Sequence, residues 1–296
     1  MDDRPGPRLN WWRLLGWMIA ILALGFIFRW LLMLDRRVWS SLAQLRVGWL
    51  LGSLAVFQLW FGLRYFAWEM IVRRHGSEAQ RHQTLRTWTV SELMRYVPGN
   101  VWSFAAKYRG TVTAGAPAAS TIQALVIEAM GLVGGAGMIA LLYLNATDWW
   151  WAALLVIAGL PILLPWLLTV VGKMAHWSDM PPVTMIEVLA LLVWYGLVWI
   201  VFGLATAMVW WSFPDLSAVT LSRLIGVNVA AWFVGYVSVI TPMGLGVREV
   251  TFVKLTTGTL TNAVASLVAL VTRLWFIVSE LVFLSFVLLW SAIRRS

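Results

Sequence analysis

Runs of about 20 apolar residues recur along this chain, and each is long enough to cross the roughly 30 Å hydrocarbon core of a bilayer as an α-helix. The 296 residues are 61% hydrophobic and 12% charged, which excludes the surface of an ordinary soluble domain. The runs are continuous and lack the alternation of a transmembrane β-barrel. The sequence therefore predicts an all-α, polytopic transmembrane helical bundle that forms a single domain over residues 1–296.

Seven runs qualify as spans, and the polar segments between them indicate their orientation. The densest basic segment follows the second run and contains Arg73, Arg74, Arg81 and Arg86. Because cytoplasmic loops are enriched in Lys and Arg, we expect this segment and the N-terminus on the cytoplasmic side, although the basic link 35–46 departs from clean alternation. The predicted spans are 14–34, 47–72, 121–144, 149–171, 183–211, 221–240 and 262–290.

Two further segments, 92–104 and 240–250, are too short, too polar and too rich in Pro and Gly to be ordinary spans. Proline removes a backbone donor and glycine frees the backbone dihedrals. Non-helical backbone at membrane depth survives only where it is packed in protein or lines a wet cavity. We therefore expect two broken or re-entrant helices beside a cavity, and seven to eight spans in total. The helix-breaking residues are Pro98, Gly99, Pro242, Gly244 and Gly246.

The two broken segments also indicate an internal repeat. Pro98 and Pro242 are 144 residues apart, nearly half the chain, and each broken segment follows a long run and leads into another. Transporters are often built from such repeats around a midplane site. The candidate repeat halves are 1–171 and 183–296, and the sequence leaves open whether they are parallel or inverted.

Charges inside the apolar regions are the candidate site, because each costs about 2.5 to 3.5 kcal/mol at the bilayer centre even on the mild insertion scales. Glu128 shares a helix face with Ala124, Gly131 and Gly135, a surface on which another helix can pack closely. It either contributes to a site or forms a helix-locking ion pair, for which Arg273 is a plausible partner.

The second broken segment places Arg248 and Glu249 directly after its helix breakers, where a guanidinium and free helix-terminal amides can hold a phosphate. Arg95 is its counterpart in the first half. Lys107 is either a headgroup contact or, more simply, a positive-inside residue. The predicted substrate-binding residues are Arg95, Tyr96, Asn100, Glu128, Arg248, Glu249 and Arg273.

Other charges in the apolar runs have simpler readings. Arg64 and Glu69 lie within the second run, and Glu69 has Arg73 one turn away, a spacing that suits an i,i+4 ion pair. Glu280 lies two turns after Arg273 on the same face of the last run.

Several classes of function are disfavoured. The chain has no Cys and only three His, all in polar connecting segments, so we expect no metal site and no cofactor. Its net charge of +9 is carried by residues that flank the spans, which favours membrane over nucleic acid as the partner. Since no recognisable catalytic motif occurs, we expect no enzyme.

Two motifs carry a family resemblance. Residues 92–102 contain Glu92, Arg95-Tyr96, Pro98-Gly99 and Trp102, and residues 242–249 read P-M-G-L-G-V-R-E. The chain resembles the transmembrane-region family of lysylphosphatidylglycerol synthases, flippase-like integral membrane proteins, in a short form without the C-terminal synthase domain. The resemblance implies movement of a lipid and not aminoacyl transfer.

We expect a translocase for a phospholipid or a polyprenyl-linked lipid, such as a lipid-linked sugar, in a prokaryotic inner membrane, with a charged groove between the broken helices. The alternative is a non-transporting, lipid-binding subunit that supports a separate lipid synthase or glycosyltransferase. A third hypothesis, an enzyme that acts on lipid phosphate with Glu128 or Glu249 as general base, ranks last because neither carboxylate has a recognisable nucleophile or metal partner.

Overall fold

The computed structural model describes residues 44–76, 80–96, 101–143, 150–174, 181–216, 219–238 and 244–293. The regular elements in these ranges are helices, which confirms the all-α prediction for this part of the chain. Five are long: α3 (Val47–Arg74), α6 (Ala118–Tyr143), α7 (Trp150–Met174), α8 (Met185–Trp211) and α11 (Asn262–Ile293). The shorter ones are α4 (Arg81–Leu93), α5 (Val101–Thr113), α9 (Leu221–Val237), α10 (Val247–Thr256) and the 3₁₀ turns η1 (Met94–Tyr96) and η2 (Pro214–Leu216).

Among the described residues, α3, α6, α8 and α11 are long and apolar enough to cross a membrane, as an integral membrane protein requires. They coincide with the predicted spans 47–72, 121–144, 183–211 and 262–290. Helix α9 and the segment Ala158–Met174 of α7 are apolar but shorter. The predicted span 14–34 lies outside the described residues, so the count of seven to eight spans stays a prediction.

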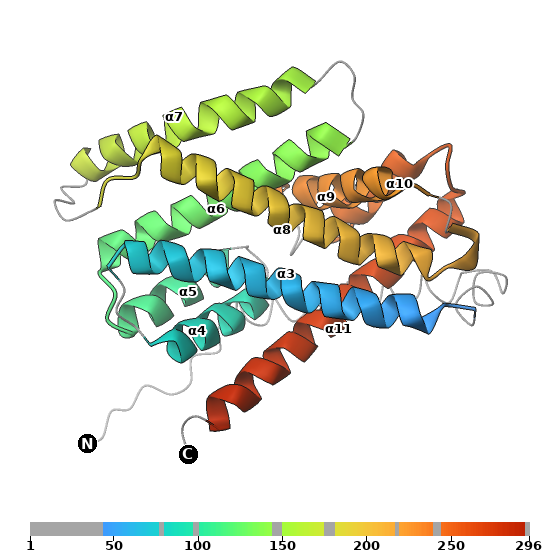
Figure 1. Ribbon diagram of the computed structural model, residues 1–296, viewed down its shortest axis with the longest axis horizontal. Coiled ribbons are helices and arrows are strands. Elements are labelled where there is room, and N and C mark those ends of the chain that lie inside the picture. Colours follow the sequence, from blue (N-terminus) through green and yellow to red (C-terminus); the bar gives the residue numbers. More distant parts are fainter. Residues whose placement is uncertain are drawn as a thin grey trace, which may run out of the picture.

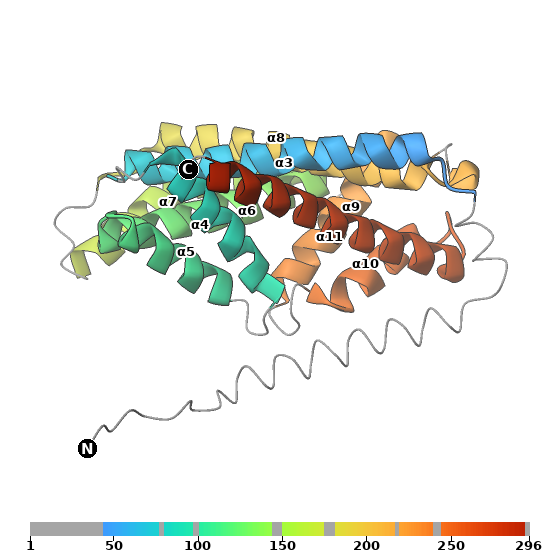
Figure 2. The same ribbon diagram turned by 90° about the horizontal axis from the view of Figure 1, so that it is seen from below.

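Each of the two Pro/Gly segments lies between two short helices. Helix α4 packs against α5, and α9 packs against α10, so the chain reverses direction at both places. In Figure 2 the two helical hairpins extend from opposite ends of the molecule toward its middle. The predicted helix breakers Pro98, Gly99 and Pro242, and the predicted site residue Asn100, lie outside the described part of the chain.

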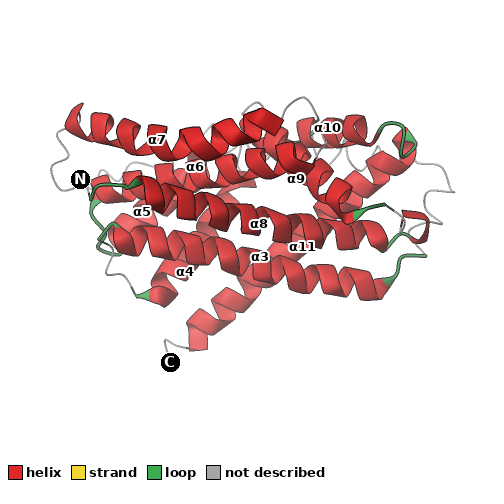
Figure 3. Cartoon of the chain, turned by 45° about the horizontal axis from the view of Figure 1, so that its top comes forward, coloured by secondary structure: helices red, strands yellow, loops and turns green. Residues whose placement is uncertain are grey.

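The order long, short, short, long occurs twice, first as α3 to α6 and then as α8 to α11. Helices α3 and α8 pack along each other, and the colours in Figure 1 show that they run in opposite directions. The internal repeat with halves 1–171 and 183–296, and whether it is parallel or inverted, stays a prediction. Helix α7 packs at the edge of the bundle on α6 and α8 (Figure 3).

An aromatic cluster joins α3, α8 and α11 at the centre of the bundle. Trp60 lies 5.3 Å from Phe202 and 5.5 Å from Phe276 between ring centroids, and Phe57 lies 5.4 Å from Phe276. These rings are buried, and such pairs contribute about 0.5 to 1.5 kcal/mol each beyond their burial. The cluster fixes the side of α11 that faces the hairpins.

Small residues bring α6 and α8 close together. Ala124, Glu128, Gly131 and Gly135 are all buried, as expected for one packed helix face. A Cβ atom added at Gly131 would lie 2.6 Å from the ring of Tyr195 on α8. Glycine at this position is therefore required by the packing, and it holds Glu128 at the level of the hairpins.

Candidate functional site

A small charged cavity lies where the two hairpins meet the long helices. Its volume is about 70 Å³, which leaves room for several water molecules. The lining comes from α3, α4, η1, α5, α6, α9 and α10, so both hairpins contribute. The charged lining residues are Arg64, Glu92, Arg95, Lys107, Glu128 and Arg248.

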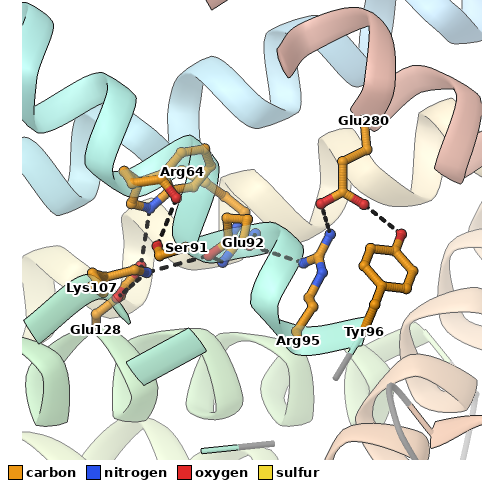
Figure 4. A network of polar contacts seen from close by, with 9 residues as sticks. Arg64, Ser91, Glu92, Arg95, Tyr96, Lys107, Glu128 and Glu280 are labelled. Carbon is orange, nitrogen blue, oxygen red and sulfur yellow. Dashed lines mark hydrogen bonds and ion pairs between the residues drawn. The ribbon is translucent and has the colours of Figure 1, made fainter. Parts of the chain in front are cut away.

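Glu92, at the end of α4, is the centre of the charge network (Figure 4). Its carboxylate accepts hydrogen bonds from Arg64 Nη1 at 2.6 Å, from Arg95 Nη1 at 2.9 Å and from Lys107 Nζ at 3.3 Å. Arg64, Glu92 and Lys107 are buried. Buried charges must be paired to be tolerated, and here one carboxylate serves three cations from three elements.

Glu128 is the second carboxylate of the cavity, and its partner differs from the one expected. Lys107 Nζ lies 2.9 and 2.8 Å from its two oxygens, and Trp88 Nε1 donates to it at 3.4 Å. The expected pairing of Glu128 with Arg273 is therefore wrong. The packing of α5 on α6 brings Lys107 to Glu128, so this lysine is buried and paired with a carboxylate and not a positive-inside residue.

Helix α11 connects to both hairpins through ion pairs. Glu280 accepts from Arg95 Nη2 at 2.6 Å and from the Tyr96 hydroxyl at 2.5 Å. Arg273 donates to Glu249 on α10. Since Arg273 and Glu280 lie two turns apart on one helix face, a single straight element holds each hairpin by a separate contact.

The glycines of the second motif permit a close approach of α10 to α9. Gly244 and Gly246 have positive φ angles of 67° and 83°, and a Cβ at Gly244 would lie 2.6 Å from the Gly235 backbone. The amide of Gly246 donates to Glu249 Oε2 at 2.7 Å. The sequence predicts free amides at this helix N-terminus, but the Gly246 amide already donates to the Glu249 carboxylate and is not free for a ligand.

Arg248 differs from the other cations of the network. It is 8% exposed and lines the cavity, yet within the described residues no ion pair or hydrogen bond reaches its guanidinium, whose contact there is the ring of Phe202 at 5.9 Å. Arg64, Arg95, Lys107 and Arg273 all have carboxylate partners. The five cations face four carboxylates, so the network has one excess positive charge, and it lies at Arg248.

Most predicted site residues come together in this network. Arg95, Glu128 and Arg248 line the cavity, and Tyr96, Glu249 and Arg273 form the contacts to α11. Asn100 lies outside the described residues.

The sequence reasoning missed the central position of Glu92 and left Arg64 and Lys107 without a role in the site. Arg64 could have been recognised as a site residue because it is a charge inside an apolar run. Glu92 could have been recognised because it lies three residues before Arg95 in the first motif.

Comparison of the chain with protein-family models, with curated proteins and with solved structures finds no match.

Proposed function

We propose that this chain is a lipid translocase of the transmembrane-region family of lysylphosphatidylglycerol synthases, located in a prokaryotic inner membrane with its N-terminus in the cytoplasm. A phospholipid or a polyprenyl-linked lipid passes between leaflets with its anionic headgroup in the charged cavity. Seven to eight spans surround two re-entrant hairpins in this arrangement.

The buried guanidinium of Arg248, which has no ion-pair partner in the part of the chain that the structure describes, carries this proposal. An uncompensated charge in a low-dielectric environment is costly, and a phosphate oxygen pair is the ligand that an arginine fork matches best. An anionic group at Arg248 would balance the network.

The surroundings of Arg248 support a lipid over a soluble anion. Two of the helices that line the cavity, α3 and α6, are apolar over lengths that match a bilayer, and the charged groups lie between the helices of the bundle. A headgroup that enters this cavity leaves water without entering hydrocarbon, while its chains stay in lipid. The cavity thereby lowers the barrier that desolvation of a phosphate imposes on lipid movement.

The decisive test is a leaflet-exchange assay in proteoliposomes. Fluorescent phosphatidylglycerol, lysylphosphatidylglycerol, phosphatidylethanolamine and a polyprenyl phosphate are each reconstituted with the protein, and the fraction accessible to a membrane-impermeant quencher is followed. We expect faster exchange of at least one anionic lipid than in empty vesicles. Arg248→Ala should abolish this exchange and Arg248→Lys should retain part of it, because lysine keeps the charge but not the fork.

Arg109→Ala is the matched control, since Arg109 is an exposed arginine outside the cavity. It should leave the exchange rate unchanged. Protein that moves none of these lipids would overturn the translocase proposal. If such protein still bound lipid and co-purified with a synthase or glycosyltransferase, the supporting-subunit alternative would take its place.

The orientation can be tested directly because the chain has no cysteine. A single cysteine placed at Arg81 should react with a membrane-impermeant maleimide only in inside-out vesicles. Labelling from the periplasmic side would contradict the proposed orientation.

A further inference from the structure

An apolar groove of about 510 Å³ lies on the outer side of the bundle, between α6, α7 and α9. Its lining includes Gly134 and Gly137 on α6, Gly159 and Leu163 on α7, and Val234 on α9. An added Cβ at Gly159 would find nothing within 4 Å. The glycine at this position therefore leaves open space on the α7 side of the groove.

The groove adjoins the charged cavity along the same two helices. On α6, Ala129 lines the cavity and Val133, one turn later, lines the groove. On α9, Tyr236 lines the cavity and Phe233, one turn earlier, lines the groove. Residues three or four apart are neighbours on a helix surface, so the two spaces are lined by neighbouring positions of α6 and of α9.

The contents of the two spaces are complementary. The cavity contains the buried Arg248, which lacks an ion-pair partner among the described residues, and the groove is almost entirely apolar. A molecule that satisfies both has an anionic group and a hydrocarbon chain joined by a short link. A soluble anion leaves the groove unused, and a neutral hydrocarbon leaves Arg248 unpaired.

We propose that the groove between α6, α7 and α9 binds one acyl chain of a diacyl phospholipid whose phosphate lies at Arg248. This inference rests on the proposed function and adds a chain-binding site to it. The protein then holds its lipid at two points, and helix α7 forms one wall of the chain site.

The test uses phosphatidylglycerol with a diazirine in one acyl chain, reconstituted with the full-length protein in vesicles. After irradiation, the cross-linked peptides are identified by mass spectrometry. We expect the adducts to concentrate on the groove faces of α6, α7 and α9. Gly159→Phe places a ring in the groove from a position where an added Cβ meets nothing within 4 Å, and it should reduce these adducts about tenfold, which corresponds to about 1.4 kcal/mol of binding.

Gly62→Phe is the matched control. Gly62 is a helical glycine on α3 that also has nothing within 4 Å of an added Cβ, and it lies outside the groove. This variant should keep the wild-type pattern of adducts. A circular dichroism melt of both variants checks that each is folded.

The outcomes separate the two proposals. Adducts spread evenly over all lipid-facing helices and unaffected by Gly159→Phe would overturn the chain site, and a loss of exchange in Arg248→Ala would then still support translocation. If neither Gly159→Phe nor Arg248→Ala changed lipid exchange, both proposals would fall. Groove adducts formed by a diazirine-labelled polyprenyl phosphate but not by phosphatidylglycerol would overturn the assignment to a diacyl lipid.

Discussion

At the scale of single residues, the charge network depends most on Glu92. Arg64, Arg95 and Lys107 all donate to its carboxylate, and two of these cations are buried with it. Removal of one member of a buried ion pair leaves the other charge uncompensated, which costs about 3 to 5 kcal/mol. The loss at Glu92 would affect three cations at once.

Glu92→Gln should therefore destabilise the protein by about 3 kcal/mol or more, seen as a lower melting temperature in detergent. Glu187→Gln is the matched control because its pair with Arg74 is half-exposed and an exposed pair contributes at most about 1 kcal/mol. Glutamine also preserves the helix cap that Glu187 forms with Thr184. Equal shifts in the two variants would contradict the central role of Glu92.

His75, just beyond the end of α3, gives the protein a pH-dependent stability. Its Nδ1 lies 2.7 Å from the Ile71 carbonyl oxygen. Burial lowers the pKa of His75 below its usual 6.5, and the neighbouring Arg74 lowers it further. The folded state therefore favours the neutral ring, whereas the unfolded state gains a proton as the pH falls below 6.5.

The sign follows from this difference in proton uptake. The contribution of His75 to the free energy of unfolding is fully present above pH 6.5. Below that pH it is lost, by at most about 1.4 kcal/mol per pH unit. The melting temperature of the wild-type protein should fall between about pH 8 and pH 5. The fall should be smaller in His75→Gln and of wild-type size in His82→Gln. A drop of the same size in His75→Gln would exclude this residue as its source.

At the scale of elements, the packing of α6 on α8 depends on glycine. An added Cβ at Gly135 would lie 2.8 Å from Tyr195 Cβ and 3.0 Å from its backbone carbonyl carbon. Backbone cannot move aside as a side chain can, so Gly135→Ala should separate the helices and cost about 1 to 3 kcal/mol. Thermal melting in detergent measures this loss.

Gly62→Ala is the corresponding control on α3, where an added methyl group meets nothing within 4 Å. Because alanine is the better helix former, this variant should be unchanged or up to about 1 kcal/mol more stable. A Gly135→Ala protein as stable as Gly62→Ala would show that the close approach is not required.

The sequence predicts these elements and their partners to different degrees. Length and apolar composition are local properties, so α3, α6, α8 and α11 follow directly from it, and so does the pair of Glu69 with Arg73 one turn away, at 2.9 Å. Lys107 and Glu128 are 21 residues apart, and they meet because α5 packs against α6 after the short connection 114–117. No periodicity encodes that contact, which is why Arg273 was the more reasonable partner from the sequence.

At the scale of the whole molecule, α11 is the one element of the described chain that has ion pairs to both hairpins. Glu280 holds Arg95 and Tyr96 of the first hairpin, and Arg273 holds Glu249 of the second. The hairpins extend from opposite ends of the bundle (Figure 2). Loss of one contact would loosen the attachment of one hairpin to α11 while the other hairpin stays attached to it, which is the asymmetry that access from alternating sides requires.

Hydrogen exchange of the purified protein can measure whether the two contacts are independent. Glu280→Gln should raise amide exchange in α4 and η1 by at least about tenfold, equivalent to about 1.4 kcal/mol, and leave α10 unchanged. Arg273→Gln should do the reverse, so each variant is the control for the other. Tyr96→Phe, which removes one of the two donors to Glu280, should give a smaller increase in the first hairpin only. If either α11 variant loosened both hairpins equally, α11 would hold them as one rigid unit, and their separate release could not underlie lipid movement.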